Sequence, residues 1–477
     1  MPGGSELVDD LRAVVGADRL RSGPFDTALY SRDGSLIRGD AGVVVLPVDA
    51  DEVQQIVRVC HRHGTPFVAR GSGTGLAGGA VPVGDPVVIV LSKMDRLLEV
   101  DVEERVAWVE PGILNLDVST RLRPHGLHFA PDPSSQSVCS IGGNVANNSG
   151  GPHCLAYGVT SAHILAMEVV LPDGRVTTLG SLDPEPAGYD LRGVFVGSEG
   201  TLGIATKVAV RLTPNPPDVR TLLLDFTSVA DGAAAVSGII AGGVVPAALE
   251  MMDRPAVEVV EAFVHAGYPT DAAAVLLVEV DGPAAACDAE VEAIVSVARE
   301  HGVRDVRVAA DDAERDLLWK GRKAAFGAVA SVAPDYYLHD TVVPRTRLVE
   351  VLDEIYDIAA RHELQVINVF HAGDGNLHPI LAFDAREDGV IERVHRAGEE
   401  IVRASLDAGG VLSGEHGIGI EKRDFMPMMF SAHDLELQDR LRAAFDPGNL
   451  ANPEKVIPSG SRCGDLSPQR VPAGAWV

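Results

Sequence analysis

The chain has 477 residues, 46 % of them hydrophobic, so we expect two or three globular domains rather than one core. Its formal net charge of −28 excludes nucleic acid as an expected partner, because binding to phosphates needs a basic surface. The five cysteines have no paired spacing, which excludes a zinc ribbon, an iron–sulfur ligand run and a disulfide framework. With neither an apolar run long enough for a membrane span nor a secretory signal, we predict a cytoplasmic protein.

The first 216 residues predict a mixed α/β pattern. After a helix and an irregular lead-in we expect strands, one helix and two hairpins, separated by a Gly-rich loop and a long ordered loop. In chain order these are the strand 43–47, the helix 49–64, the strands 65–70 and 87–91, the hairpin 98–111, the loop 131–158, the hairpin 164–174 and the strand 204–214. The Pro-rich run "TPNPPDV" indicates a domain boundary near residue 216.

Beyond that boundary, strands alternate with helices that are rich in Ala. Because no phosphate-binding loop opens any of these helices, the alternation indicates an α+β layer with an antiparallel sheet. We expect strands at 221–226, 274–282, 306–310 and 336–344, and helices near 228–241, 284–302, 311–331, 345–363 and 388–408. The tail 459–477 is rich in Gly, Ser and Pro, and we expect it to be loosely held.

The loop "RGSGTGLAGG", residues 70–79, contains the spacing G-x-G-x-x-G at Gly73, Gly75 and Gly78. A dinucleotide fingerprint of that form must open a helix, but Pro82 and Pro86 follow the loop and prevent one. The Rossmann interpretation therefore fails. A Gly-rich loop between two strands can still form an anion-binding nest with its backbone N–H groups, so a non-Rossmann dinucleotide site and a plain flexible loop remain open.

The stretch "NVFHAGDGNLHPILAF", residues 368–383, places a histidine on each side of a tight turn. The flanking segments predict strands, and a hairpin would bring His371 and His378 close together. The loop "SGEHGIGIEK", residues 413–422, offers Glu415 and His416. With Glu415, the two histidines form a two-His, one-carboxylate set suited to zinc, manganese or iron. A buried polar cluster without a metal is the alternative.

Three segments, "VARGSGTGLAGGA", "PDPSSQSVCSIGGNVANNSGGPHCLAYGVT" and "GSEGTLGIATKV", resemble the PCMH-type FAD-binding domain of the vanillyl-alcohol oxidase family. With "NVFHAGDGNLHP" and "NPEKVIP", the chain resembles the FAD-linked 2-hydroxyacid dehydrogenases, especially their glycolate oxidase and D-lactate dehydrogenase branches. The resemblance implies an α+β fold with an FAD-binding domain at 1–216 and a substrate and metal domain at 217–458. It also implies that the segment near 413–458 returns to the flavin.

The resemblance also implies which residues hold FAD. The first loop would bind the pyrophosphate, through Arg70, Gly71, Ser72, Gly73, Thr74 and Gly75. The second loop would lie along the ribityl chain and the ring, with further contacts from the "GSEGT" segment. These residues are Pro131, Ser137, Gly142, Gly143, Asn144, Gly151, Gly200 and Ile204. We interpret His153 and Cys154 as packing residues, because the hydroxyacid branch generally binds FAD non-covalently.

The implied reaction is the oxidation of a small D-2-hydroxy acid, glycolate or D-lactate, to the 2-oxo acid with FAD and a divalent metal. His416 would take the hydroxyl proton, and Asn376 would orient the substrate. Arg322 matches the arginine that pairs with the substrate carboxylate in the family, whereas Lys320 and Lys323 are expected on a solvated helix face.

The family's 2-hydroxyglutarate branch carries a Lys and a Thr at positions that we match to Leu338 and Phe326, which favours a small monocarboxylate. The alternatives are a D-2-hydroxyglutarate dehydrogenase, a metal-dependent hydrolase without redox chemistry, and a non-catalytic flavin-binding subunit. The chain has no cluster motif of its own. The resemblance therefore allows a separate iron–sulfur electron-transfer subunit or another carrier, which could bring the protein to the inner face of the membrane.

Overall fold

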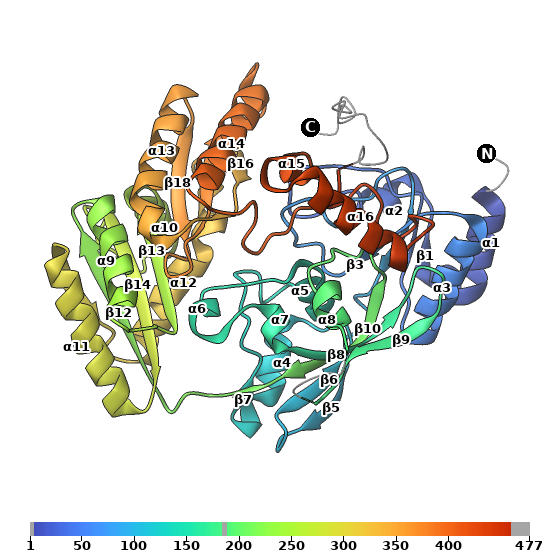
Figure 1. Cartoon of the computed structure of the whole chain (residues 1–477), viewed down its shortest axis with the longest axis horizontal. Helices are drawn as coiled ribbons and strands as arrows, with labels where there is room; N and C mark the ends of the chain where they lie inside the picture. The colour runs from blue at the N-terminus through green and yellow to red at the C-terminus, as the bar shows by residue number, and fades with distance from the viewer. Residues whose placement is uncertain (1–3, 184–187, 459–477) are drawn as a thin grey trace. The chain divides into compact units, whose positions relative to one another are not determined.

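The computed structural model describes residues 4–183 and 188–458, so the predicted tail 459–477 lies outside the described residues. The chain forms two compact units (Figure 1). Of the described residues, unit 1 comprises those up to Gly150, those from Val159 to Asn215 and those from Glu415 onward, and unit 2 comprises Gly151–Gly158 and Pro216–Gly414. The chain thus passes from unit 1 to unit 2 at the Pro-rich run and returns directly after Gly414.

The first sheet of unit 1 has four strands, of which three are parallel. In spatial order they are β1 (Leu20–Arg21), β2 (Val43–Val45), β4 (Val87–Val90) and β3 (Phe67–Arg70). The helices nearby in the sequence are α1 (Gly4–Val15), η1 (Ala17–Arg19), α2 (Pro24–Ala28) and α3 (Ala50–His63). Helix α3 begins where the Asp49 side chain accepts the N–H of Glu52 and ends at Gly64, which has φ +60°. The apolar faces of α1 and α3 form one core with the valines of this sheet.

The second sheet of unit 1 has five antiparallel strands. In spatial order they are β5 (Leu97–Asp101), β6 (Val106–Val109), β10 (Ile204–Arg211), β8 (Ile164–Val170) and β9 (Val176–Gly180). A two-stranded sheet pairs β7 (Leu127–His128) with β11 (Thr213–Pro214). Further helices of the unit are α4 (Asn115–Leu122), η2 (Arg123–His125), α8 (Leu191–Phe195), η4 (Arg423–Phe425), α15 (Met426–Met429) and α16 (Ala432–Phe445). The hairpins predicted at 98–111 and 164–174 are both confirmed.

The segment 131–158, predicted as one long loop, contains short helices. These are α5 (Ile141–Asn147) and α6 (Cys154–Tyr157), followed by α7 (Thr160–His163). The prediction of an uninterrupted loop was wrong because Ser140 caps α5: its hydroxyl accepts the N–H of Gly143 at 3.4 Å, which offsets the poor helix propensity of Gly142 and Gly143.

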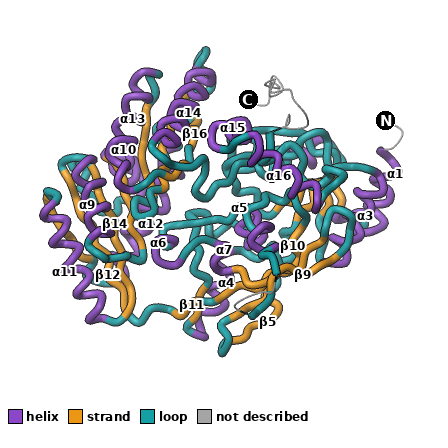
Figure 2. The backbone as a smooth tube through the Cα atoms, in the orientation of Figure 1, coloured by secondary structure: helices purple, strands orange, loops and turns teal. Residues whose placement is uncertain are grey.

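Unit 2 is built on a seven-stranded sheet in which all neighbouring strands are antiparallel, as the strand and helix alternation predicted. In spatial order its strands are β15 (Val303–Val308), β12 (Asp218–Phe226), β14 (Ala274–Gly282), β13 (Ala248–Asp253), β18 (Gln365–Phe370), β20 (Pro379–Phe383) and β16 (Asp335–Leu338). A short ladder joins β17 (Thr341–Val342) to β19 (Asn376–Leu377). Figure 2 shows the resulting alternation of strands and helices along this part of the chain.

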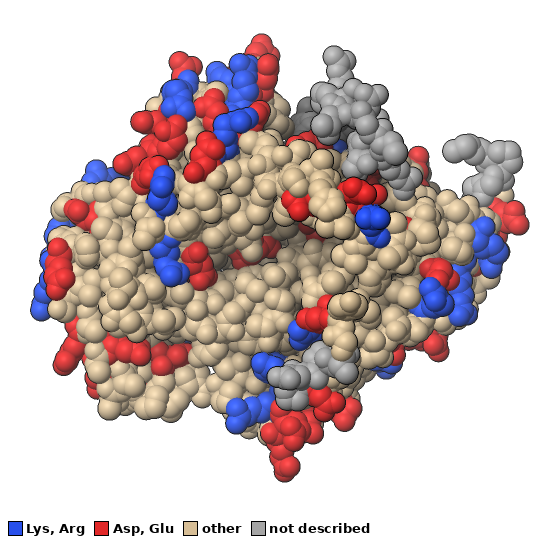
Figure 3. All heavy atoms as spheres, in the orientation of Figure 1, with Lys and Arg blue, Asp and Glu red and all other residues tan. Residues whose placement is uncertain are grey.

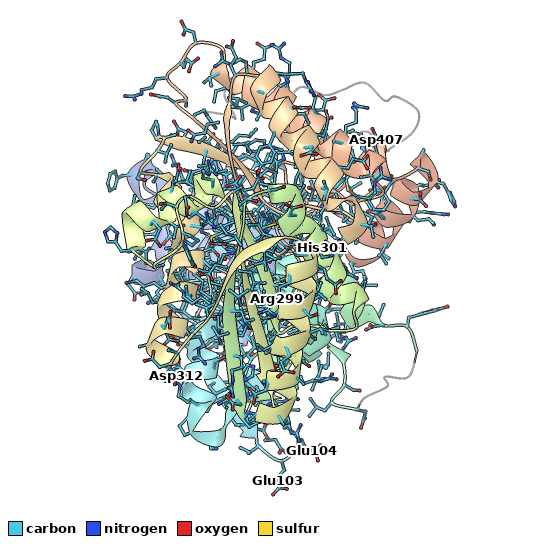
Figure 4. All side chains as sticks on the ribbon, turned by 90° about the vertical axis from the view of Figure 1, so that its left-hand side faces the viewer. Glu103, Glu104, Arg299, His301, Asp312 and Asp407 are labelled. Carbon is cyan, nitrogen blue, oxygen red and sulfur yellow. The ribbon has the colours of Figure 1, made fainter. Side chains whose placement is uncertain are left out.

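Four helices bury one face of that sheet in the main core of unit 2. They are α9 (Val229–Ala241), α11 (Ala284–Glu300), α13 (Leu348–Arg361, preceded by η3, Arg345–Arg347) and α14 (Val390–Asp407). In Figure 4, α11 lies over the strands, and the labelled Arg299 and His301 mark its C-terminal end. The remaining long helices, α10 (Arg254–Val264) and α12 (Asp312–Val329), pack against each other, and α10 contacts β13, β14 and β18.

Charged side chains of both signs are interspersed on α13 and α14 (Figure 3). Several are paired, as in the contacts of Arg361 with Glu354 (3.1 Å) and Glu400 (2.8 Å). Mixed charges of this kind are typical of a solvated surface. Within residues 4–183 and 188–458, no helix combines the length and the apolar character that crossing a bilayer requires.

Candidate active site

The histidine stretch forms a hairpin in unit 2. His371 and Asn376 exchange two backbone hydrogen bonds, of 3.1 and 3.2 Å, across the turn. Gly375 has φ +71°, and a Cβ there would lie 2.1 Å from the carbonyl oxygen of Val343, so the turn needs glycine at this position. The imidazole rings of His371 and His378 stand 5.0 Å apart between centroids and nearly perpendicular, at 88°. The hairpin therefore brings the two histidines together, as the sequence predicted.

Glu250, which the sequence analysis missed, lies opposite His371. Strand β13 pairs with β18 in the register Met251 to Phe370, so the next position along places Glu250 beside His371. Both carboxylate oxygens lie within hydrogen-bond distance of His371 Nδ1, at 2.8 and 2.9 Å. Burial alone would raise the pKa of Glu250, but its interactions with His371 and Arg322 outweigh it and leave that pKa below its ordinary value.

Arg322 projects from α12 to the same carboxylate. Its side chain is fully buried, and Nη2 lies 2.5 Å from Glu250 Oε2. Among the described residues, its Nε and Nη1 atoms have no hydrogen-bond partner. Lys320 of the same helix is exposed, and Lys323 lies over the ring of Trp319 at 5.8 Å. Of the three cations in this stretch, only Arg322 is buried beside the histidine hairpin.

A second buried carboxylate, Asp340, binds the last residues of unit 2, Ser413 and Gly414. It accepts hydrogen bonds from Ser413 Oγ (2.5 Å) and from the N–H of Gly414 (3.1 Å), and it lies 3.9 Å from His378 Nδ1. When the side-chain amide of Asn376 is oriented so that both its oxygen and its nitrogen have suitable hydrogen-bond partners, the nitrogen donates to Asp340 at 2.9 Å and to the Thr341 carbonyl at 3.2 Å. Asp340 thus holds Gly414, and the residue that follows Gly414 in the chain is Glu415.

In unit 1, the first glycine loop has no helix after it, which agrees with the rejection of the Rossmann interpretation. A Cβ on Gly71 would lie 2.3 Å from Ser140 Oγ, and one on Gly73, at φ +72°, would lie 2.1 Å from the Arg70 guanidinium. Both positions therefore need glycine. Arg70 itself is mostly buried, and its Nη1 atom has no hydrogen-bond partner among the described residues. The loop thus presents a guanidinium whose Nη1 donor is not taken up by any described residue.

The second glycine-rich segment is tied together by Asn115. Its side-chain amide donates to the Pro131 carbonyl at 2.9 Å and to Asn144 Oδ1 at 3.0 Å. Gly142 approaches Pro111 so closely that a Cβ would lie 2.7 Å from the proline side chain. Ile204 is 1 % exposed and packs in the core, so any contact that it makes with a cofactor would come from its backbone.

The other predicted cofactor residues lie on both units. Ser137 is exposed, Gly143 donates to the cap of α5, and Gly200 has φ +73°. Gly151 belongs to the segment 151–158, which clusters with unit 2. In that segment His153 lies 3.2 Å from the buried Glu279 and 5.4 Å from the Trp319 ring, as a packing residue would.

Glu199 holds the returning segment of the chain onto unit 1. This buried carboxylate accepts the N–H groups of Ile418 (2.7 Å) and Gly419 (2.8 Å). The side chain of Asn147 donates to the His416 carbonyl at 2.6 Å. The backbone around His416 is therefore fixed by the loops that resemble an FAD site. We call Glu199 with its two backbone donors the Glu199 clasp.

The Glu199 clasp is electrostatically unusual. Burial raises the pKa of Glu199 to about 7, against the effect of its two backbone donors. Burial also lowers the pKa of Lys455 to about 8, and the charge of Glu199 opposes that shift. The motif "GSEGT" contains Glu199, but sequence reasoning took only Gly200 from it. The sequence did offer an indication of its role, because Glu199 is a charged residue in a glycine-rich turn between Gly197 and Gly200.

Comparisons with known proteins match two parts of the chain. Residues 41–180 match the family model described as "FAD binding domain", and residues 215–456 match "FAD linked oxidases, C-terminal domain". The chain is 45% identical to the glycolate oxidase subunit GlcD of Escherichia coli (strain K12), over 93% of this chain and 89% of the relative. It is 32% identical to a D-lactate dehydrogenase of Anaerostipes hadrus, over 94% of this chain and 97% of the relative.

Solved structures share the fold at low sequence identity. The structure of p-cresol methylhydroxylase with substrate bound has a TM-score of 0.81 at 17% identity, over 96% of this chain and 98% of that one. The 4-ethylphenol oxidase of Gulosibacter chungangensis has a TM-score of 0.80 at 20% identity, over 95% and 97% of the two chains. With the two family models and the relatives above, these likenesses show that the chain is an FAD-binding oxidoreductase and belongs to the family of FAD-linked oxidases that includes glycolate oxidase subunit GlcD and the D-lactate dehydrogenases.

Proposed function

We propose that this chain oxidises a small D-2-hydroxy acid, glycolate or D-lactate, to the 2-oxo acid by hydride transfer to FAD, with a divalent metal at the histidine hairpin. The observation that carries the proposal is a buried group of three side chains, His371, Glu250 and Arg322. The carboxylate of Glu250 contacts both His371, a potential metal ligand, and Arg322, a cation that could pair with a substrate carboxylate. The names of the relatives at 45% and 32% identity support the substrate class.

The residues of unit 2 fit a divalent ion. Two imidazoles stand 5.0 Å apart, and one of them already meets a carboxylate through Nδ1, as metal-bound histidines usually do. Glu415 is the proposed third ligand. Asp340 holds the N–H of Gly414, and consecutive Cα atoms are only about 3.8 Å apart, so the chain itself keeps Glu415 near that carboxylate. Zinc, manganese and iron all accept such a set.

Each part of the reaction has a proposed residue. A bound divalent metal would polarise the substrate hydroxyl and lower its pKa. His416 would accept the hydroxyl proton, and its backbone is held for this by Asn147. Arg322 would pair with the substrate carboxylate, and Asn376 would orient the substrate from the hairpin. FAD, bound through the glycine loops of unit 1, would take up the hydride from the α-carbon.

Two apolar side chains in unit 2 favour a small substrate. The ring of Phe326 lies 6.2 Å from that of His378, edge to face, and Leu338 is buried in β16. Neither side chain can bind a second carboxylate, whereas a 2-hydroxyglutarate enzyme needs polar groups for one. We therefore propose a monocarboxylate substrate. Since the relative at 45% identity is named as a subunit, we also propose a separate electron-transfer partner. The cytoplasmic localisation stays a prediction.

An anaerobic titration of the purified yellow protein tests the proposal. Glycolate or D-lactate should bleach the flavin band, whereas L-lactate and D-2-hydroxyglutarate should do so poorly. A protein that bleaches with none of these acids would be a non-catalytic flavin subunit, and one without bound flavin would restore the hydrolase alternative. Preferential bleaching by D-2-hydroxyglutarate would refute the choice of a monocarboxylate.

Metal analysis tests the ligands separately. His371→Ala, His378→Ala and Glu415→Ala should each lose the metal and keep FAD, because the proposed FAD contacts lie mainly on the glycine loops of unit 1. Lys320→Ala, which changes an exposed side chain on α12, is the matched control and should keep both. Full metal occupancy in any one of the three variants would remove that residue from the ligand set.

A further inference from the structure

Glu250 is a buried charge that the proposed reaction does not itself use. Its side chain is fully buried in the middle of β13, where an unpaired carboxylate would cost several kcal/mol. It is compensated on two sides, by His371 Nδ1 and by Arg322 Nη2. Because the two partners come from a strand end and a helix, this one acid joins elements that are distant in the sequence.

The contact with His371 sets the orientation of its ring. Nδ1 lies 2.8 and 2.9 Å from the two carboxylate oxygens, so the proton of the ring is assigned to Nδ1. With Nδ1 donating, Nε2 is the ring nitrogen with a lone pair for a metal. Metal-bound histidines commonly depend on such a carboxylate, and loss of the partner weakens metal binding by about 10- to 100-fold.

The contact with Arg322 sets the place of the cation. Nη2 lies 2.5 Å from Oε2, while the Nε and Nη1 donors have no hydrogen-bond partner among the residues that the structure describes. A guanidinium donates five hydrogen bonds, so one contact with Glu250 leaves donors for a second anion. The carboxylate of a 2-hydroxy acid is an anion of the right kind.

We propose that Glu250 is a positioning residue that aligns the metal ligand His371 with Arg322, so that one substrate can meet the metal through its hydroxyl and the guanidinium through its carboxylate. This inference rests on the proposed function. Glu250 touches neither substrate nor metal. It fixes the spacing between His371, which would bind the metal, and Arg322, which would bind the substrate. Loss of Glu250 should therefore affect both metal affinity and substrate affinity.

The experiment compares Glu250→Gln with Asp253→Asn in the purified flavoprotein. Asp253 is also a fully buried carboxylate of β13, but it accepts hydrogen bonds from the backbone N–H of Ala256, the side-chain amide of Asn368 and the hydroxyl of Tyr356 instead of contacting the hairpin histidines. Zinc affinity is measured by competition with a chromophoric chelator, and kcat and KM for glycolate and D-lactate are measured in zinc-saturated protein. Thermal unfolding of both variants is measured as well, so that a general loss of stability is distinguished from a specific loss of zinc affinity.

Glu250→Gln should weaken zinc binding by about 10- to 100-fold and raise KM, whereas Asp253→Asn should leave zinc affinity unchanged. If Glu250→Gln does not fold, Glu250→Asp decides, because a side chain one methylene shorter cannot keep both contacts. Zinc affinity and KM both within about twofold of the parent in Glu250→Gln, or in Glu250→Asp if the first variant does not fold, would overturn the inference. Failure of the parent itself to bind zinc, manganese or iron would instead refute the proposed metal site.

Discussion

Replacing Glu199 with alanine should loosen the segment that carries His416 from unit 1. The carboxylate is the acceptor for the N–H groups of Ile418 and Gly419, at 2.7 and 2.8 Å. Alanine supplies no acceptor, and the side chain of Glu199 is buried, so water does not readily replace it. The change therefore removes the Glu199 clasp while leaving the sequence of the segment itself intact.

The expected change in the free energy of local opening depends on two opposing effects. Two backbone donors left without an acceptor cost about 1–3 kcal/mol each. Against this, burial raises the pKa of Glu199 to about 7, which shows that the buried carboxylate is itself disfavoured, and alanine removes that cost. The two donors together cost about 2–6 kcal/mol, and the relieved cost is up to about 3 kcal/mol, so we expect the free energy of local opening to fall by about 1–3 kcal/mol, which increases the open population by about 5- to 150-fold.

Amide hydrogen exchange measures this opening directly. Peptides that cover residues 415–422 should exchange about 5- to 150-fold faster in Glu199→Ala, and peptides of α3 should be unchanged. Glu199→Gln, which keeps one carbonyl oxygen as an acceptor, should fall between alanine and the parent. Unchanged exchange at residues 415–422 in the alanine variant would show that other contacts hold the segment.

Three further predictions concern single side chains. Arg322→Lys keeps the charge beside Glu250 but loses the planar fork, so KM should rise by about 10-fold in steady-state assays, and an unchanged KM would assign the substrate carboxylate to another group. His416→Asn should keep metal and flavin but slow flavin reduction by about 10²- to 10⁴-fold in rapid mixing, with partial recovery at higher pH; reduction at the parent rate would refute the base assignment. Burial raises the pKa of Asp253 from 3.8 to about 6, so the folded state binds the extra proton between these values, and stability should fall by up to about 3 kcal/mol as pH rises through them. Chemical unfolding at pH 4.5 and 7 should show this slope in the parent and a smaller one in Asp253→Asn; equal slopes would mean that Asp253 does not titrate in this range.

The sequence determined the features that depend on neighbours in the chain. The cap at Asp49 and the Gly at position 64 set the limits of α3, and alternation set the hairpins of unit 1. The histidine hairpin was predictable for the same reason, since His371 and His378 are separated only by a short turn with Gly375 at positive φ. In each case the residues that make the contact lie within about 15 positions of each other.

The tertiary structure alone decided which distant residues complete those features. No element was predicted between residues 242 and 273, because "ALEMMD" lacks β-branched residues and does not alternate, and yet it forms β13. Pairing with β14 and β18 makes it a strand, and the register of that pairing places Glu250 opposite His371, 121 positions away. Glu199 likewise meets Ile418 across 219 positions. Contacts of this range depend on strand register and core packing, which a local pattern of residues does not encode.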